Sequence, residues 1–181
     1  SGVLVNLNTQ SKENNSIVID KAAGFYSFSK GSSSQDYPSS LTGGIALLRQ
    51  TFYDAIWYNK NKSGYNISLD EFNKLQSLPS IFEANDKFNS LRAAKIGEEF
   101  NIKYILKGCG NEYQRINDLQ NTKLNFIIPV NFPEAFDVED PFDSESISLT
   151  DLKHWELAPS NPASLEKNGI QFFFTTAELK D

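Results

Sequence analysis

The sequence predicts an α/β fold made of parallel β/α units that form part of a TIM-barrel-like structure. Three short apolar runs, at residues 80–84, 102–107 and 124–130, recur about every 22 residues. Stretches with apolar residues at helical spacing lie between them. Because parallel neighbouring strands need a helical crossover, this order predicts a parallel sheet without hairpins. A doubly wound sheet is the alternative arrangement, and we favour the barrel.

The first of these units begins after Pro79, where residues 80–84 have the length and composition of a buried strand. Asp86 follows in the position of a helix N-cap. The next apolar side chains, at Phe88, Leu91, Ala94 and Ile96, have near-helical spacing. We therefore expect a helix that ends near residue 100.

The later units repeat this order. A second strand is expected at residues 102–107, closed by the turn 108–110, and a second helix at 111–120. A third strand follows at 124–130, and then a long acidic loop. A short helix is expected between Asn161-Pro162 and Gly169, because proline favours helix starts and glycine favours helix ends. Residues 170–176 form the expected fourth strand.

The first third of the chain is less regular. Two strands are expected at residues 3–7 and 16–20, with a polar turn at 12–15, and a Ser-rich loop at 27–34. A long helix is expected to begin near Ser39 or Ser40 and to bury one face. The residues of that face are Leu41, Ile45, Leu48, Phe52 and Ile56. The sequence at 68–71 resembles a capping box that opens another helix.

Taken together, these elements predict one partial β/α barrel domain over residues 1–181. Residues 1–78 form its irregular part and residues 79–181 its regular βα units. The chain has 181 residues, whereas a complete barrel of this kind typically has about 250. It opens with Ser1 and contains no Met, so we expect a fragment of a longer chain.

Composition excludes several classes of protein. The net charge is −6 and no basic stripe is present, so a nucleic-acid partner is not expected. No apolar run approaches the ~20 residues of a membrane span. Cys109 is the single cysteine, which excludes a disulfide within the chain and a zinc site built on several cysteines.

Functional side chains of a parallel β/α barrel lie at the carboxyl ends of its strands. That rule selects Glu83 and Lys107 as candidate catalytic residues, and Asn85, Asn131 and Thr176 as candidate ligand-binding residues. Carboxylate and amide oxygens beside a cation can polarise a carbonyl group or hold a metal ion. The alternative interpretation is a structural ion pair between Glu83 and Lys107.

Four other features have a structural and a functional interpretation. The turn 107–110 is a weak match to a phosphate-binding turn, and a tight turn into a helix is the alternative. His154 is the single histidine, and a packing role is favoured over catalysis. For Cys109 a buried, inert thiol is favoured over a nucleophile. The acidic stretch 134–145 does not have the spacing of a calcium-binding EF-hand, so a solvated loop is expected.

Several segments together resemble a bacterial branch of the amidohydrolase superfamily, related to imidazolonepropionases and common among Bacteroidetes-like sequences. The segments are residues 28–32, 37–41, 45–52, 82–86, 131–133, 137–141 and 155–159. The resemblance implies a hydrolase of C–N bonds, including cyclic amides, in a small molecule or a peptide. It also implies that one or two divalent ions, zinc in many members, activate water in the whole enzyme.

The metal ligands of that family do not carry over to this sequence. Glu83 stands where the fifth-strand histidine is expected, and the sixth strand ends at Lys107. Ala177 stands near the expected eighth-strand aspartate. Either this branch binds metal in a different way, with Glu83 as an oxygen ligand, or its strands have lost the classical site. In the isolated chain we expect no cofactor and no activity.

Two further expectations come from the fragment hypothesis and from the resemblance. Strand edges of a partial barrel predict self-association, and export to the periplasm follows from the resemblance alone. The competing hypothesis is a catalytically degenerate β/α domain that binds a ligand or a partner.

Overall fold

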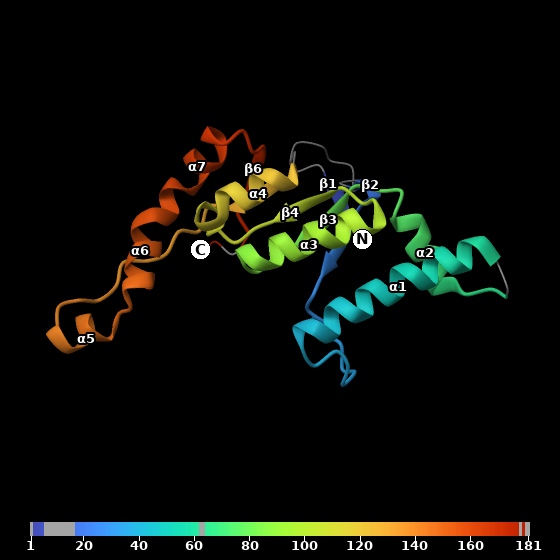
Figure 1. Cartoon of the computed structure of the whole chain (residues 1–181), viewed down its shortest axis with the longest axis horizontal. Helices are drawn as coiled ribbons and strands as arrows, with labels where there is room; N and C mark the ends of the chain where they lie inside the picture. Colours follow the sequence, from blue (N-terminus) through green and yellow to red (C-terminus); the bar gives the residue numbers. More distant parts are fainter. Residues whose placement is uncertain (1, 6–16, 62–63, 178, 180–181) are drawn as a thin grey trace, which may run out of the picture. The chain divides into compact units, whose positions relative to one another are not determined.

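The computed structural model describes residues 2–5, 17–61, 64–177 and 179 (Figure 1). The chain divides into two compact units. The first contains Ser1–Glu83 with Lys95–Tyr104, and the second contains Ala84–Ala94 with Ile105–Asp181.

The first unit combines an antiparallel and a parallel strand pair. Its strands are β1 (Gly2–Val5), β2 (Ile17–Ser27) and β3 (Ser80–Glu83). Leu4 of β1 pairs antiparallel with Ile19, whereas β2 pairs parallel with β3 through partners such as Tyr26 and Phe82. The strand predicted at 16–20 is therefore shorter than β2, because β2 continues to Ser27 through a stretch with few large apolar residues. The turn expected at 12–15 lies outside the described residues.

Helices α1 (Leu41–Asn61) and α2 (Ile67–Leu75) connect β2 to β3. The start of α1 confirms the sequence prediction, but the predicted buried face is wrong in part. Leu41 and Ile56 are each 39% exposed. The buried residues of α1 are Gly44, Phe52, Ala55 and Tyr58. A Cβ atom on Gly44 would lie 2.5 Å from the backbone oxygen of Phe28, so a residue without a side chain permits this close approach.

The expected capping box of α2 is also corrected. Asn66, not Ser68, is the N-cap residue, and its side-chain oxygen accepts hydrogen bonds from the backbone N–H groups of Ser68 and Leu69. Asparagine is as good an N-cap as serine, so the choice depends on where the preceding loop ends.

Aromatic side chains form the core of the first unit. Phe52, Phe82 and Tyr104 are fully buried. The ring of Tyr104 lies 5.2 Å from that of Phe82 and 5.5 Å from that of Tyr26, both in edge-to-face geometry. Such pairs contribute roughly 0.5–1.5 kcal/mol each beyond the burial of their surface. Aromatic packing therefore contributes to the stability of this unit.

Helix α3 (Lys87–Phe100) follows β3 and confirms the expected helix. The Asp86 carboxylate accepts hydrogen bonds from the backbone N–H groups of Phe88 and Asn89, at 2.7 and 2.8 Å. Asp86 is therefore the N-cap that the sequence predicts.

The second unit contains the regular parallel strands. They are β4 (Tyr104–Lys107), whose first residue belongs to the first unit, β5 (Asn125–Pro129) and β6 (Phe172–Thr175). Leu106 pairs with Phe126, and Phe126 pairs with Phe172, in parallel register. The 3-10 helix η1 (Glu112–Arg115) and helix α4 (Ile116–Thr122) connect β4 to β5. Within each unit the strands lie in chain order, β1, β2 and β3 in the first and β4, β5 and β6 in the second.

The acidic segment between β5 and β6 is partly helical, which the sequence interpretation missed. It contains helices α5 (Pro141–Ser146) and α6 (Leu149–Leu157), the 3-10 helix η2 (Ala158–Ser160) and helix α7 (Asn161–Lys167). Asp140 caps α5 and Pro141 occupies its first turn. The expectation of a loop was wrong because short exposed helices with capping residues leave little apolar periodicity. The expected helix from Asn161 to Gly169 is confirmed as α7.

These observations confirm the predicted fold class. The structure is a mixed α/β fold whose strands are mostly parallel and are joined by helical crossovers, as in part of a TIM-barrel-like fold. No helix among the described residues has both the length and the apolar character needed to cross a membrane.

Candidate functional site

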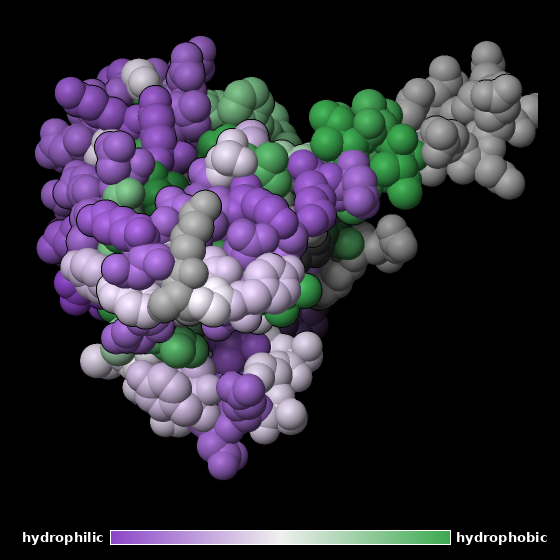
Figure 2. Space-filling view, turned by 90° about the vertical axis from the view of Figure 1, so that its right-hand side faces the viewer, coloured by the Kyte–Doolittle hydropathy of each residue, from purple (hydrophilic) through white to green (hydrophobic). Residues whose placement is uncertain are grey.

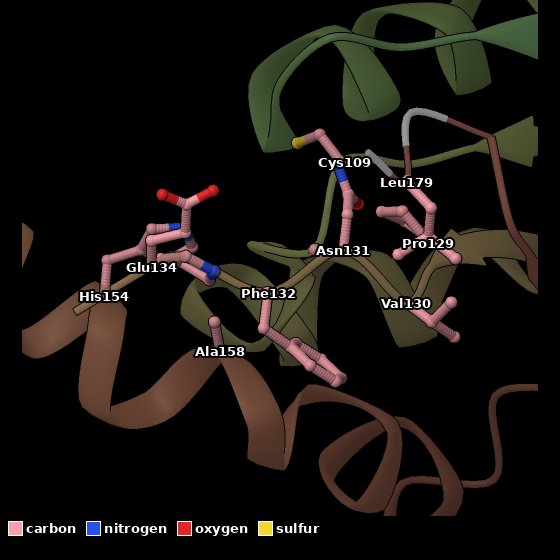
Figure 3. Close-up of a pocket in the computed structure, with 11 residues that line it drawn as sticks. Cys109, Pro129, Val130, Asn131, Phe132, Glu134, His154, Ala158 and Leu179 are labelled. Carbon is pink, nitrogen blue, oxygen red and sulfur yellow. The ribbon is translucent and has the colours of Figure 1, made fainter. Parts of the chain in front are cut away.

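The loops after β4 and β5 leave the same edge of the sheet. Because β4 and β5 are parallel and Lys107 pairs with Ile127, their carboxyl ends lie side by side. A cavity of about 540 Å³ opens there, a volume within the usual range for small-molecule sites (Figure 3). Its lining residues are Cys109, Gly110, Pro129, Val130, Asn131, Phe132, Pro133, Glu134, His154, Ala158 and Leu179.

A buried carboxylate fixes the loop after β4. Glu112 is fully buried, and one of its oxygens accepts hydrogen bonds from the backbone N–H groups of Cys109 and Gly110, at 2.8 and 3.3 Å. A Cβ atom on Gly108 would lie 2.1 Å from the same oxygen. The glycine is therefore needed for the carboxylate to reach the turn.

This contact also decides between the two interpretations of the turn 107–110. A phosphate-binding turn presents its backbone N–H groups to an anion. Here the N–H groups of Cys109 and Gly110 donate to Glu112, and the acidic side chain would repel a phosphate. These contacts favour the tight turn over a phosphate-binding turn.

Asn161 ties this loop to helix α7. Its amide nitrogen donates to the second oxygen of Glu112 at 2.7 Å, and its amide oxygen accepts from the backbone N–H of Tyr113 at 2.8 Å. Asn161 is 2% exposed, and its hydrogen bond to Glu112 is buried. The sequence marks Asn161 as a helix start, but the partner Glu112 is 49 residues away and has no sequence signal.

A chain of hydrogen bonds orients His154 at one end of the cavity. The Lys87 ammonium donates to the amide oxygen of Gln114, which leaves the Gln114 amide nitrogen to donate to the Tyr113 hydroxyl at 3.0 Å. The Tyr113 hydroxyl lies 3.0 Å from Nδ1 of His154, and the two rings are stacked. Because the hydroxyl accepts from Gln114, its own proton is available for Nδ1.

The hydrogen bond between the Tyr113 hydroxyl and Nδ1 of His154 fixes the orientation of the imidazole ring, and its donor depends on the tautomer of His154. The His154 ring stacks on the Tyr113 ring, and His154 also lines the cavity.

Cys109 lines the cavity as a neutral thiol. Burial, followed by the negative charge of Glu112, raises the pKa of Cys109 from 9.0 to about 12. The sulfur also lies 3.1 Å from the side-chain oxygen of Asn111. A thiolate nucleophile needs the opposite shift, so the interpretation as an inert thiol is favoured.

Of the five predicted site residues, Asn131 lines this cavity. It follows β5, and its side-chain oxygen is buried without a hydrogen-bond partner among the described residues. The backbone N–H of the preceding Val130 donates to the Thr175 oxygen at 3.2 Å, which anchors the start of the loop. Figure 3 shows Asn131 between His154 and Leu179 along the cavity.

The other four predicted site residues lie outside the lining of this cavity. Glu83 and Lys107 are the last residues of β3 and β4, and both are half-buried. Asn85 and Thr176 follow β3 and β6 and are exposed. Their strand-end positions agree with the rule that selected them, while their catalytic or binding roles stay predictions.

The residues present do not match a resident metal site. Within the described part of the chain, no three histidine, cysteine, aspartate or glutamate side chains lie close enough together to hold a metal ion. Structural zinc sites usually have four protein ligands and catalytic ones three.

A second cavity, of about 260 Å³, lies beside the Ser-rich loop of the first unit. Several of its polar groups form hydrogen bonds within the loop itself. Lys30 donates to the backbone oxygen of Gln35, and the Ser27 and Ser29 hydroxyls accept backbone hydrogen bonds within the loop. This cavity is therefore a weaker candidate than the one at β4 and β5.

Comparison with known proteins identifies one structural relative. An amidohydrolase from Thermotoga maritima MSB8 matches with a TM-score of 0.61 and 17% sequence identity. The match covers 90% of this chain and 43% of the solved chain. This chain has the fold of part of an amidohydrolase.

The chain thus spans less than half the length of the amidohydrolase structure that it matches. No family model matches the sequence. No curated protein matches it either. The likeness supports an amidohydrolase-like relationship at the level of the fold, without deciding the branch.

Proposed function

We propose that this chain is a segment of an amidohydrolase-like hydrolase that cleaves C–N bonds in a small molecule or a peptide. The observation that carries the proposal is the position of the cavity. It lies at the carboxyl ends of β4 and β5, where β/α barrel enzymes bind their substrates, in a chain with the fold of part of an amidohydrolase.

The contribution of this segment is to bind and orient the substrate. Glu112 and Asn161 hold the loop after β4 rigidly, and Asn131 adds a polar group from the loop after β5. Rigid placement of a substrate beside reacting groups supplies a large share of enzymatic rate enhancement. Glu83 and Lys107, at the ends of their strands, remain the proposed catalytic candidates, with Asn85 and Thr176 as proposed binding residues.

We further propose that any divalent ion of the whole enzyme depends on residues outside this set, and that the chain alone retains none. A bound divalent ion would supply activation of a water molecule. The support is the donor set of the described residues, which contains no group of three suitable side chains. Plasma mass spectrometry after dialysis against zinc and manganese tests this. About one tightly held ion per chain would contradict it.

A second candidate function is a catalytically degenerate β/α domain that binds a ligand or a partner. It is favoured by one observation, namely a well-formed cavity in a unit that lacks a metal-ligand set among its described residues. Both functions predict ligand binding, but the first alone predicts turnover.

The experiment that separates them is an assay for hydrolysis by the protein at its full natural length. A panel of acyclic amides, cyclic amides and short peptides is incubated with the protein, zinc or manganese being supplied, and products are detected by mass spectrometry. We expect cleavage of a C–N bond in at least one class. Binding without cleavage across the panel would favour the degenerate domain.

A further inference from the structure

Helix α5 has no buried face. All six of its residues are exposed, and Phe142 is 82% exposed. Isolated helices shorter than about 12 residues are marginal in water, so local contacts must hold one as short as this. The Asp140 carboxylate accepts a hydrogen bond from the backbone N–H of Phe142 at 2.8 Å, and the Ser144 hydroxyl donates to the backbone oxygen of Pro141 at 2.7 Å. These local hydrogen bonds hold α5 while its large apolar side chain faces solvent.

Helix α6 has two different faces. His154 is the residue of α6 that is not exposed, and it lines the cavity together with Ala158, four positions later along the chain. Leu149, Leu152 and Trp155 recur every three residues and are all exposed, Leu149 by 67%. Residues at this spacing are neighbours on one side of a helix. Helix α6 therefore turns one side to the cavity and presents an apolar stripe to solvent.

The segment that carries these apolar side chains is strongly acidic. Between residues 124 and 152 the sequence contains seven acidic residues and no lysine or arginine. Exposed apolar side chains rimmed by polar ones are typical of a surface that binds another molecule. We call this set the α5–α6 surface, and its residues are Phe142, Leu149, Leu152 and Trp155 with the acidic side chains of Asp140, Asp143, Glu145 and Asp151.

Charge determines which class of molecule fits the α5–α6 surface. The phosphates of nucleic acids and the headgroups of anionic lipids carry the same sign of charge and would be repelled. A second copy of the chain would bring the same carboxylates to the contact, and like charges that face one another oppose binding. The complementary molecule combines lysine or arginine with an apolar stripe of its own. An amphipathic helix provides both, because apolar residues at i, i+3, i+4 and i+7 share one face.

We infer that the α5–α6 surface docks a basic amphipathic helix of a partner protein. Apolar side chains of the partner cover Phe142 and the stripe on α6, and its lysine or arginine side chains lie against the carboxylates around them. Burial of apolar surface supplies affinity, and the opposite charges supply specificity and fast association. The inference does not rest on the proposed hydrolysis, because the residues of the α5–α6 surface lie outside the cavity lining.

The test uses a synthetic peptide as the probe. A helix-forming peptide of leucine and lysine, of about four helical turns and with leucine at i, i+3, i+4 and i+7, is titrated into the chain and followed by NMR. One control peptide has glutamate in place of every lysine, and another has the same composition without helical periodicity. We expect the leucine–lysine peptide to bind at least about tenfold more tightly than either control. The resonances that shift should belong to α5 and α6, including Phe142 and Trp155.

Variants connect the binding to the α5–α6 surface. Phe142→Ala and Leu149→Ala each remove an exposed apolar side chain and should weaken binding about fivefold or more. Tyr65→Ala is the matched control, because Tyr65 is 79% exposed in the first unit, and it should leave the affinity unchanged. Asp143→Lys combined with Glu145→Lys should weaken binding about tenfold, because the new charges repel the peptide. All five side chains are exposed, so the fold should be retained, and the backbone spectra report whether it is.

The outcomes also identify the other possible occupants. Equal binding of the three peptides, shifts confined to other elements, or equal losses in Phe142→Ala and Tyr65→Ala would overturn the inference. A mass by light scattering that falls for Phe142→Lys would overturn it in favour of a second copy of the chain. Binding to phosphatidylcholine vesicles that Phe142→Ala abolishes, without binding of the leucine–lysine peptide, would overturn it in favour of a lipid surface. Selective binding of that peptide at α5 and α6 supports the inference whether or not the protein hydrolyses an amide.

Discussion

At the scale of single residues, the charge state of Cys109 follows from its surroundings. The thiol is half-buried beside the carboxylate of Glu112, and both effects disfavour the thiolate. The sequence predicts an inert thiol because no histidine is close along the chain. The structure adds the physical cause.

A raised thiol pKa predicts slow alkylation of the folded chain. With a pKa of about 12 in place of 9.0, the thiolate fraction of Cys109 at pH 8 is very small. We expect iodoacetamide to react with the folded chain at least about a hundredfold more slowly than with the chain unfolded in urea. Equal rates in the two states would contradict this account of the site.

The same shift links stability to alkaline pH. The folded state binds the Cys109 proton more tightly than the unfolded state, so this contribution is fully present below pH 9. It is lost as the pH rises from 9 towards about 12. A comparison of urea unfolding of the chain and of Cys109→Ala across that range isolates the contribution. The free energy of unfolding that Cys109 contributes should fall with rising pH in the unchanged chain, and Cys109→Ala should lack this contribution.

At the scale of elements, one buried side chain links the loop after β4 to helix α7. Glu112→Ala would leave the N–H groups of Cys109 and Gly110 and the amide of Asn161 without their acceptor. We expect the free energy of unfolding to fall by about 2–4 kcal/mol, measured by urea denaturation. Glu166→Ala is the matched control, since Glu166 is exposed on α7, and it should change stability by less than about 0.5 kcal/mol.

Glu112→Gln refines this prediction. The amide keeps one acceptor oxygen, so the loss should be smaller than for Glu112→Ala. A Glu112→Ala chain as stable as the control variant would contradict the role assigned to this carboxylate.

Sequence patterns predicted some of the helices and strands and missed others. The helix after Asp86 and the parallel strands were predictable because a local cap and apolar runs determine them. Helix α5 was missed because its stability comes from Asp140 and Pro141 rather than from a buried face. The strand β2 was predicted too short because its second half is defined by pairing with β3.

The candidate site was predictable only in part, for a similar reason. Asn131 was selected because strand ends are visible in the sequence. Glu112 and Asn161 were not selected, because their contact joins residues 49 positions apart. His154 was identified as a single histidine, but its orientation depends on Tyr113 and Gln114.

At the scale of the whole molecule, large apolar side chains are exposed on several strands. Figure 2 shows hydrophobic residues gathered at one side of a largely hydrophilic face. The exposed apolar residues of β1, β2 and β6 include Val3, Leu4, Val5, Ile17, Val18, Ile19, Phe173 and Phe174. Large apolar patches and open strand edges commonly lead proteins to associate.

We therefore propose that the chain alone forms oligomers through these strands. Phe173, at the open edge strand β6, is 60% exposed. Light scattering should show a mass above 20.3 kDa that falls for Phe173→Lys. The control Phe142→Lys, on the exposed helix α5, should leave the mass unchanged. A monomer at all concentrations would contradict the proposal.

The central claim is that the cavity at the carboxyl ends of β4 and β5 is the ligand site of this chain. The most direct measurement is a crystal structure of the chain soaked with the amides and short peptides of the hydrolysis panel. We predict that at least one of these compounds occupies this cavity. Compounds bound only elsewhere, or a cavity that stays free of all of them at saturating concentration, would contradict the claim.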